Sequence, residues 1–110
     1  MSRRRRKPPP PPEAQPGFAD PLLDERPVAE LDLHGVPAAD AERRVMDFVQ
    51  TMARLHAGRV VRIITGKGLH SPAGPVLLGV VEGVLKGPGS LVVGAFRRDP
   101  FGGGIRVRVL

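Results

Sequence analysis

Apolar residues recur along the chain with two different spacings, and each spacing predicts one kind of secondary structure. From residue 38 to residue 57 they keep the helical spacing that is typical of a helix with one buried face. A second stripe of this kind runs from residue 76 to residue 85. Pro37 suits the start of the first helix, and Gly58 suits its end. We therefore expect two amphipathic helices.

Shorter segments of the chain carry the pattern of strands, because they are rich in β-branched residues or alternate between apolar and polar ones. They are residues 28–33, 59–64, 91–96 and 105–109. The predicted order is β-α-β-α-β-β, with a turn or a flexible loop over residues 97–104. Right-handed crossovers then place both helices on one face of the sheet. We expect an α/β (α+β) two-layer sandwich with a four-stranded mixed sheet.

The N-terminal part of the chain differs in composition from the rest and predicts a disordered tail. Basic residues at positions 3–7 precede a run of proline at positions 8–12. Such a segment buries too little apolar surface to offset the entropy of ordering it. Only Phe18, Leu22 and Leu23 are candidates to dock on a domain. We therefore assign residues 1–27 to the tail and residues 28–110 to the domain.

The charge of the chain favours an anionic partner. The formal net charge is +6, and residues 1–27 carry six Lys or Arg against four Asp or Glu. Residues 28–110 carry eleven against seven, so the basic excess is not confined to the tail. Nucleic acid is the simplest partner for such a domain.

Composition also excludes several other classes of protein. The chain has no cysteine, which excludes disulfides and cysteine-ligated metal. No apolar run approaches the ~20 residues that span a bilayer, so we expect no membrane partner. We expect a cytoplasmic monomer.

Residues 31–35 place an acid and an imidazole together at the end of the first strand. Side chains alternate between faces along a strand, so Leu31 and Leu33 face one way while Asp32 and His34 face the other. The carboxyl ends of strands are where open α/β sheets form ligand crevices. Alone, such a pair is more typical of a solvent-facing strand than of a site.

Residues 65–71 form a second candidate, in the turn between the second strand and the second helix. Thr65 opens this turn, and Gly66 and Gly68 let the backbone approach a ligand closely. Exposed amides beside Lys67 can bind a phosphate. The turn is not a Walker A loop, because Val61 stands where that motif needs a glycine. A G-x-G turn alone more often serves only as a turn.

Arg106 and Arg108 alternate with apolar residues in the last strand, so the pattern sets both on one exposed face. We expect this pair to contact phosphates. The chain has four Phe and no Trp or Tyr, so few platforms for base stacking are available. Backbone electrostatics should then dominate binding.

Three motifs together resemble the Smr (small MutS-related) domain. They are L-D-L-H-G at residues 31–35, T-G-K-G-L-H-S at residues 65–71, and the glycine-rich ending over residues 102–110. The resemblance covers residues 28–110 and is closest to the small stand-alone bacterial members. The loop between Phe96 and Gly102 is shorter than usual for that family, and Arg97-Arg98 replace an alanine.

The resemblance implies a fold similar to the C-terminal domain of bacterial translation initiation factor three. It also implies nucleic-acid binding and, as in several members, endonuclease activity that nicks DNA or cleaves RNA, including messenger RNA on stalled or collided ribosomes. The family's D-x-H falls on Asp32 and His34, and its G-x-G turn on residues 66–68. The histidine that follows is His70.

A mechanism follows as a hypothesis. Histidine side chains exchange protons near neutral pH, so His34 is the candidate acid or base, with Asp32 to orient it. Lys67 and the amides of Gly66 and Gly68 would hold the scissile phosphate, with His70 as the second acid or base. On RNA the 2′-hydroxyl serves as nucleophile without metal. On DNA an activated water is needed, and Asp32 and His34 could then hold Mg²⁺ or Mn²⁺, although these two side chains are a thin ligand set.

Two other interpretations stay open, so the sequence does not establish that the chain is an enzyme. One is a DNA- or RNA-binding module without catalysis. The other is an adaptor associated with the ribosome or with DNA repair, in which the tail and a protein contact matter most.

Overall fold

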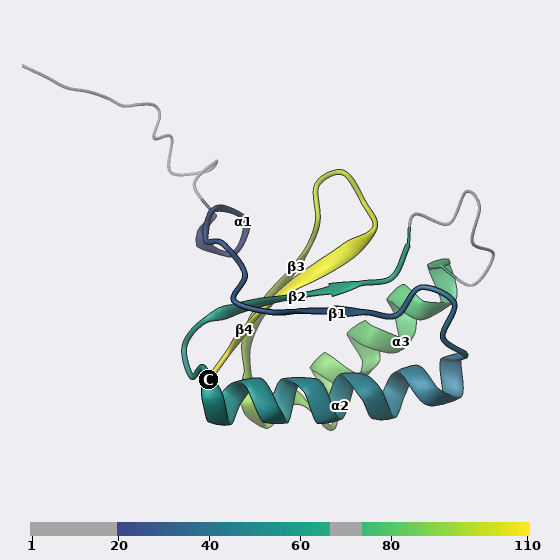
Figure 1. Cartoon of the computed structure of the whole chain (residues 1–110), viewed down its shortest axis with the longest axis horizontal. Coiled ribbons are helices and arrows are strands. Elements are labelled where there is room, and N and C mark those ends of the chain that lie inside the picture. Colours follow the sequence, from purple (N-terminus) through teal and green to yellow (C-terminus); the bar gives the residue numbers. More distant parts are fainter. Residues whose placement is uncertain (1–19, 67–73) are drawn as a thin grey trace, which may run out of the picture.

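Four strands form one mixed sheet, and the two longer helices lie together on one of its faces (Figure 1). The computed structural model describes residues 20–66 and 74–110 of the chain. Its elements, in order, are α1 (Pro21–Asp24), β1 (Glu30–Asp32), α2 (Ala38–Leu55), β2 (Val60–Ile64), α3 (Gly74–Lys86), the 3-10 turn η1 (Ser90–Val92), β3 (Val93–Arg98) and β4 (Gly104–Val109). From β1 onwards this order confirms the predicted β-α-β-α-β-β arrangement. The expected likeness to initiation factor three stays a prediction.

The strands lie in the order β1-β2-β4-β3. β1 and β2 run parallel, with Asp32 opposite Ile64, whereas β4 is antiparallel to both of its neighbours. A parallel pair needs a crossover, and α2 supplies it. Because the two strands point the same way, both end at the same edge of the sheet.

The hydrophobic core lies between the sheet and the helices. Alternate residues of a strand share one face, and on this face the strand side chains are apolar. Leu33, Val61, Ile63, Ile105 and Val107 are fully buried there. They meet the apolar stripes of the two helices, namely Ala41, Val45 and Val49 of α2 and Leu77, Val81, Val84 and Leu85 of α3. None of the described helices combines the length and apolarity needed to cross a membrane.

The third strand is displaced toward the C-terminus relative to the prediction. Leu91 lies in η1, and β3 continues to Arg98, so Arg97 and Arg98 are strand residues rather than part of a loop. The reason is pairing: Arg97 lies opposite Arg106, and Arg98 lies opposite Ile105. The antiparallel partner therefore extends the strand beyond its apolar residues.

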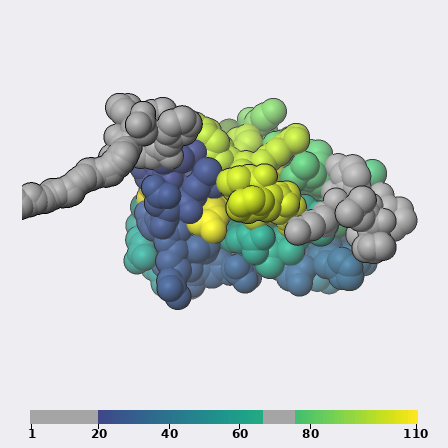
Figure 2. All heavy atoms as spheres, turned by 90° about the horizontal axis from the view of Figure 1, so that it is seen from above, coloured from purple at the N-terminus to yellow at the C-terminus, as the bar shows by residue number. Residues whose placement is uncertain are grey.

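Residues 20–27, which fall in the predicted tail, pack on the face of the sheet that the long helices leave open. Asp20 caps α1 by accepting a hydrogen bond from the amide of Leu22 at 3.0 Å. The Leu22 side chain is only 4% exposed. In Figure 2, which looks onto this face, the segment lies beside β4 and the β3–β4 turn. One buried leucine and a capped turn hold a segment whose composition suggests a tail.

We expect Leu22→Ala to lower the free energy of unfolding by about 2 kcal/mol, because it empties a buried site at the edge of the fold. Leu55→Ala is the matched control, since Leu55 is 63% exposed near the end of α2. Chemical denaturation of both variants measures the difference. Equal stabilities for the two variants would show that residues 20–27 are not part of the folded domain.

Candidate functional site

The first two motifs meet at the edge where β1 and β2 both end. The amide of Leu33 donates to the carbonyl oxygen of Ile64 at 2.7 Å, so the parallel ladder continues one residue past β1. The turn that carries His34 therefore starts beside the turn that opens with Thr65. Asp32 and His34 are both exposed, as the alternation predicts, and Leu33 between them is buried.

Asp32 acts on the backbone of the turn that follows it. Its Oδ1 accepts a hydrogen bond from the amide of His34 at 2.9 Å. The amide of Val36 donates to the Leu33 carbonyl at 2.9 Å, and Gly35 has a positive φ of 78° that favours glycine. The carboxylate thus fixes the peptide that bears the imidazole, which is a less direct role than the predicted orientation of the ring itself.

Thr65 and Gly66 are tied to the glycine-rich turn before β4. Both amides donate to the carbonyl oxygen of Gly103, at 2.9 Å and 3.2 Å. The Thr65 side chain is 1% exposed, and Gly66 has a φ of 89°. The Gly66 amide therefore already has a protein partner, and Thr65 serves to anchor the turn. Lys67, Gly68 and His70 of the same motif lie outside the described residues.

The Gly103 carbonyl is a contact that reasoning from the sequence missed. The stretch before β4 is predicted to be a turn or a flexible loop, and it is a held turn: the amide of Asp99 donates to the Gly104 carbonyl at 2.9 Å, and that of Gly102 donates to the Asp99 carbonyl at 3.0 Å. Gly102 and Gly103 have φ values of 79° and 87°, which only glycine adopts without strain. The run of glycines at residues 102–104 was the signal in the sequence that could have predicted this tight turn.

Arg106 and Arg108 are half-buried beneath residues 20–27, where the sequence predicts an exposed pair. Arg106 donates to the backbone carbonyls of Leu23 at 3.0 Å and of Glu25 at 3.1 Å. Arg108 pairs with the Glu25 carboxylate at 3.0 Å and donates to the Gly58 carbonyl at 2.8 Å. Both guanidinium groups are therefore committed to protein partners, because the N-terminal segment covers their face of the sheet.

The Asp99 carboxylate contacts two neighbouring arginines, Arg62 of β2 and Arg106 of β4. Arg62 and Arg106 are directly opposite each other in the β2–β4 register. The Asp99 carboxylate, 9% exposed, accepts from Arg62 at 2.6 Å and 2.8 Å and lies 3.4 Å from Nε of Arg106. The hydrogen bonds to Asp99 raise the pKa of Arg62. The facing Oδ1 of Asp99 and Nε of Arg106 are buried without hydrogen-bond geometry, so this second contact is electrostatic.

Glu25 ties the N-terminal segment to the sheet. Its carboxylate accepts from Nε of Arg59 at 3.2 Å and pairs with Arg108. These hydrogen bonds, from Arg59 first and Arg108 second, lower the pKa of Glu25. A charged Glu25 thus favours the docked segment.

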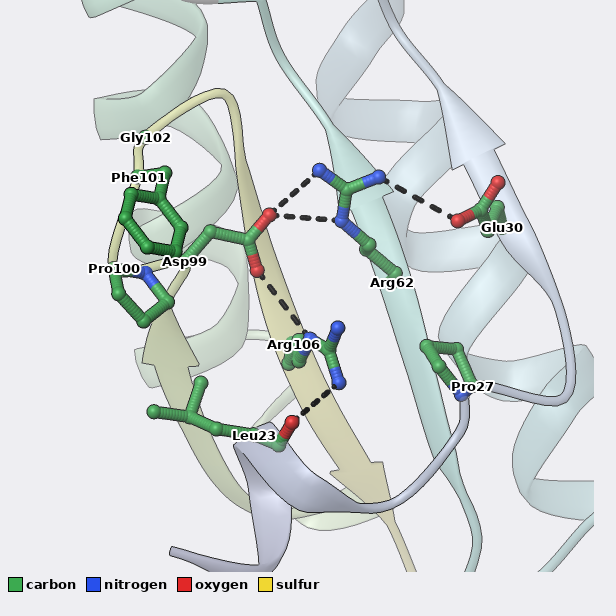
Figure 3. Close-up of a pocket in the computed structure, with 9 residues that line it drawn as sticks. All are labelled: Leu23, Pro27, Glu30, Arg62, Asp99, Pro100, Phe101, Gly102 and Arg106. Carbon is green, nitrogen blue, oxygen red and sulfur yellow. Dashed lines mark hydrogen bonds and ion pairs between the residues drawn. The ribbon is translucent and has the colours of Figure 1, made fainter. Parts of the chain in front are cut away.

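A hollow of about 450 Å³ opens on the same face, beside the β3–β4 turn (Figure 3). Arg62 and Arg106 approach it from the strands, and Phe101 stands at its rim on the turn. Residues of the N-terminal segment and of β1 complete the lining, namely Leu23, Pro27 and Glu30, together with Asp99, Pro100 and Gly102 of the turn. The sequence analysis does not predict this hollow.

Comparison with protein families now adds to this geometry. A family model, the Smr domain, matches residues 31–105, which is more than half of the chain. This chain belongs to the Smr domain family. The family is related to nucleic-acid binding and to nucleases. No curated protein sequence matches the chain.

The matched span separates two parts of this Smr protein. It contains both turns at the sheet edge and the turn over residues 99–103, whose Gly103 carbonyl accepts the amides of Thr65 and Gly66. It leaves out residues 20–27, which cover the arginine face, and also Arg106 and Arg108. The His34 edge and the turn over residues 99–103 therefore lie inside the matched span, and the segment that covers the arginine face lies outside it.

The donor set at this edge is small. Among residues 20–66 and 74–110, no group of three or more His, Asp or Glu side chains is placed to hold a metal ion. Asp32 and His34 supply one carboxylate and one imidazole, and one carboxylate oxygen already accepts the His34 amide. These two residues alone are a weak fit for Mg²⁺, which prefers oxygen ligands in octahedral geometry.

We expect Glu25→Gln to destabilise this Smr protein at neutral pH and the loss to shrink in acid. The pKa of Glu25 is lowered by folding, so its ionised form adds stability above the ordinary glutamate value of ~4.3. That contribution disappears as the pH falls through the lower pKa of the folded state. Thermal unfolding from neutral pH to about pH 3 measures it.

The control for this experiment is Glu42→Gln, since Glu42 is exposed on α2 and forms no ion pair within the described part of the chain. Its stability difference from the parent should stay small at every pH. The same small, pH-independent difference for Glu25→Gln would contradict the role assigned to Glu25.

Proposed function

We propose that this Smr protein is an endonuclease that cleaves phosphodiester bonds of nucleic acid, with His34 as proton donor or acceptor. One observation carries the proposal. The turns of His34 and of Thr65–Gly66 leave adjacent parallel strands at the same edge, joined by the 2.7 Å bond from Leu33 to Ile64. The turn that carries the exposed His34 thus starts beside the turn in which the lysine-bearing motif starts.

RNA is the substrate that these groups could cleave without a metal ion, because RNA supplies its own nucleophile. The 2′-hydroxyl loses its proton, its oxygen attacks phosphorus, and the bond to the 5′-oxygen breaks as that oxygen gains a proton. The products are a 2′,3′-cyclic phosphate and a 5′-hydroxyl. An imidazole can carry either proton, and such transfers typically accelerate a reaction by ~10²–10⁴-fold.

Asp32 supports this step as a positioning residue. Its hydrogen bond to the His34 amide holds the peptide of the turn, which limits where the ring can lie. Lys67 is assigned the scissile phosphate and His70 the second proton, and both assignments rest on the motif. The Gly66 amide donates to the Gly103 carbonyl, so the proposal assigns the phosphate to Lys67 rather than to this amide.

Nicking of DNA is the second form of the same proposal. DNA lacks the 2′-hydroxyl, so a water must be activated, and a bound Mg²⁺ or Mn²⁺ would supply that activation. Asp32 and His34 would need further ligands to hold it. Such an enzyme would act in the cytoplasm, and its role would be ribosome rescue or DNA repair and recombination.

We expect His34→Ala to reduce cleavage by at least ~100-fold while nucleic-acid binding survives, because the ring is exposed and contributes no core packing. The matched control is His56→Ala. His56 is also an exposed histidine, but it ends α2, close to where β2 begins and so at the opposite edge of the sheet. Gel analysis of labelled single-stranded RNA, duplex DNA and branched DNA, with and without EDTA, measures rate, substrate and metal dependence together.

Equal cleavage by the His34 and His56 variants would contradict the assignment of His34. Salt-dependent binding of all three probes without any cleavage by the parent protein would instead support a non-catalytic binding module. Loss of His56 should leave every rate unchanged.

A further inference from the structure

The turn over residues 99–103 displays an aromatic ring that the folding of the domain does not explain. Phe101 is 89% exposed. Exposure of a large aromatic side chain forgoes the stabilisation that its burial would give. The turn that carries it is held by hydrogen bonds at both ends, from Asp99 to Gly104 and from Gly102 to Asp99. The ring is thus presented on a fixed support.

The hollow beside this ring has the lining that a nucleobase needs. Its volume of about 450 Å³ lies within the range of small-molecule sites. Phe101, Pro100 and Pro27 supply apolar surface for the flat faces of a base. Arg62 and Glu30, with side chains 25% and 53% exposed, pair with each other at 3.5 Å along its wall. The Glu30 carboxylate, the more exposed of the two groups, has a second oxygen that can accept from the polar edge of a base.

The hollow is connected to the His34 edge through two elements. Gly102 lines the hollow, and the next residue, Gly103, accepts the amides of Thr65 and Gly66. Glu30 also lines it, and Asp32 lies on the same face of β1 two residues further on, ~6.6 Å along the strand. A base in the hollow would therefore belong to a nucleotide close to the phosphate at His34.

We propose that this hollow binds one unstacked nucleobase next to the cleaved bond, with Phe101 as its stacking platform. The inference rests on the proposed function in that it takes nucleic acid as the ligand. It restricts the substrate to strands that are unpaired at this position, because a base inside a duplex presents neither a free face nor a free edge. Phe101 would then be one of the few exposed stacking platforms that the composition of this chain allows.

The test uses the full chain carrying His34→Ala, so that binding is measured without cleavage. Single-stranded RNA oligomers with one abasic position each, moved along the strand, are titrated by fluorescence anisotropy. We expect one abasic position to weaken binding by about 5- to 100-fold, which is the usual range for loss of one base–aromatic stack. Adding Phe101→Ala should weaken the intact oligomer similarly and abolish the effect of that abasic position.

The matched control is Leu91→Ala, since Leu91 is 88% exposed but lies in η1, before β3 begins. It should leave both affinity and the abasic profile unchanged, whereas Phe101→Trp should retain them. Thermal unfolding of the Phe101→Ala protein should match that of its parent, because the ring is exposed.

Three results would overturn the inference: Phe101→Ala binding the intact oligomer as its parent does, an abasic profile that Phe101→Ala leaves unaltered, or an equal effect of Phe101→Ala on fully paired duplex. Cleavage by the chain with native His34 is measured separately. Cleavage together with any of these results would leave the proposed function standing and remove the base site. A stacking signal without cleavage would leave the base site standing and remove the proposed function.

Discussion

The parallel pairing of β1 with β2 is the constraint on which the site depends. The Leu33 amide and the Ile64 carbonyl, 2.7 Å apart, extend that pairing to the edge of the sheet. Leu33 is fully buried, so a shift in register would expose it and bury an acid or an imidazole instead. The core thereby fixes which turn lies beside which, and the Gly103 carbonyl then holds the second turn from the other side.

The face of the sheet that the long helices leave open carries several arginines, and acidic residues pair with them. Like charges directly across strands destabilise a sheet, yet Arg62 and Arg106 stand opposite each other. Asp99 offsets this repulsion. Glu25 pairs in a similar way with both Arg59 and Arg108. The basic excess of the domain is therefore partly neutralised on this face.

Local patterns predicted the elements well because their causes are local. Helical spacing and Gly58 defined α2 to within two residues of its end, and the alternation around Leu33 predicted the exposure of Asp32 and His34. The covering of the arginine face was not predictable in this way. It joins residues more than eighty positions apart, and the Pro-rich composition around Leu22 argues against order. Asp99 was missed for a related reason, since its two partners come from different strands.

Mapping the RNA-binding surface of the protein by NMR tests whether the substrate binds at the edge where β1 and β2 end. The ¹⁵N-labelled protein is titrated with a single-stranded RNA whose 2′-hydroxyls are replaced by 2′-methoxy groups, so that it binds without being cleaved. We expect the changes in amide shift to gather at His34, Gly66 and Gly102, on the edge where β1 and β2 end. Shifts gathered instead around His56 and Gly58, at the opposite edge, would contradict it.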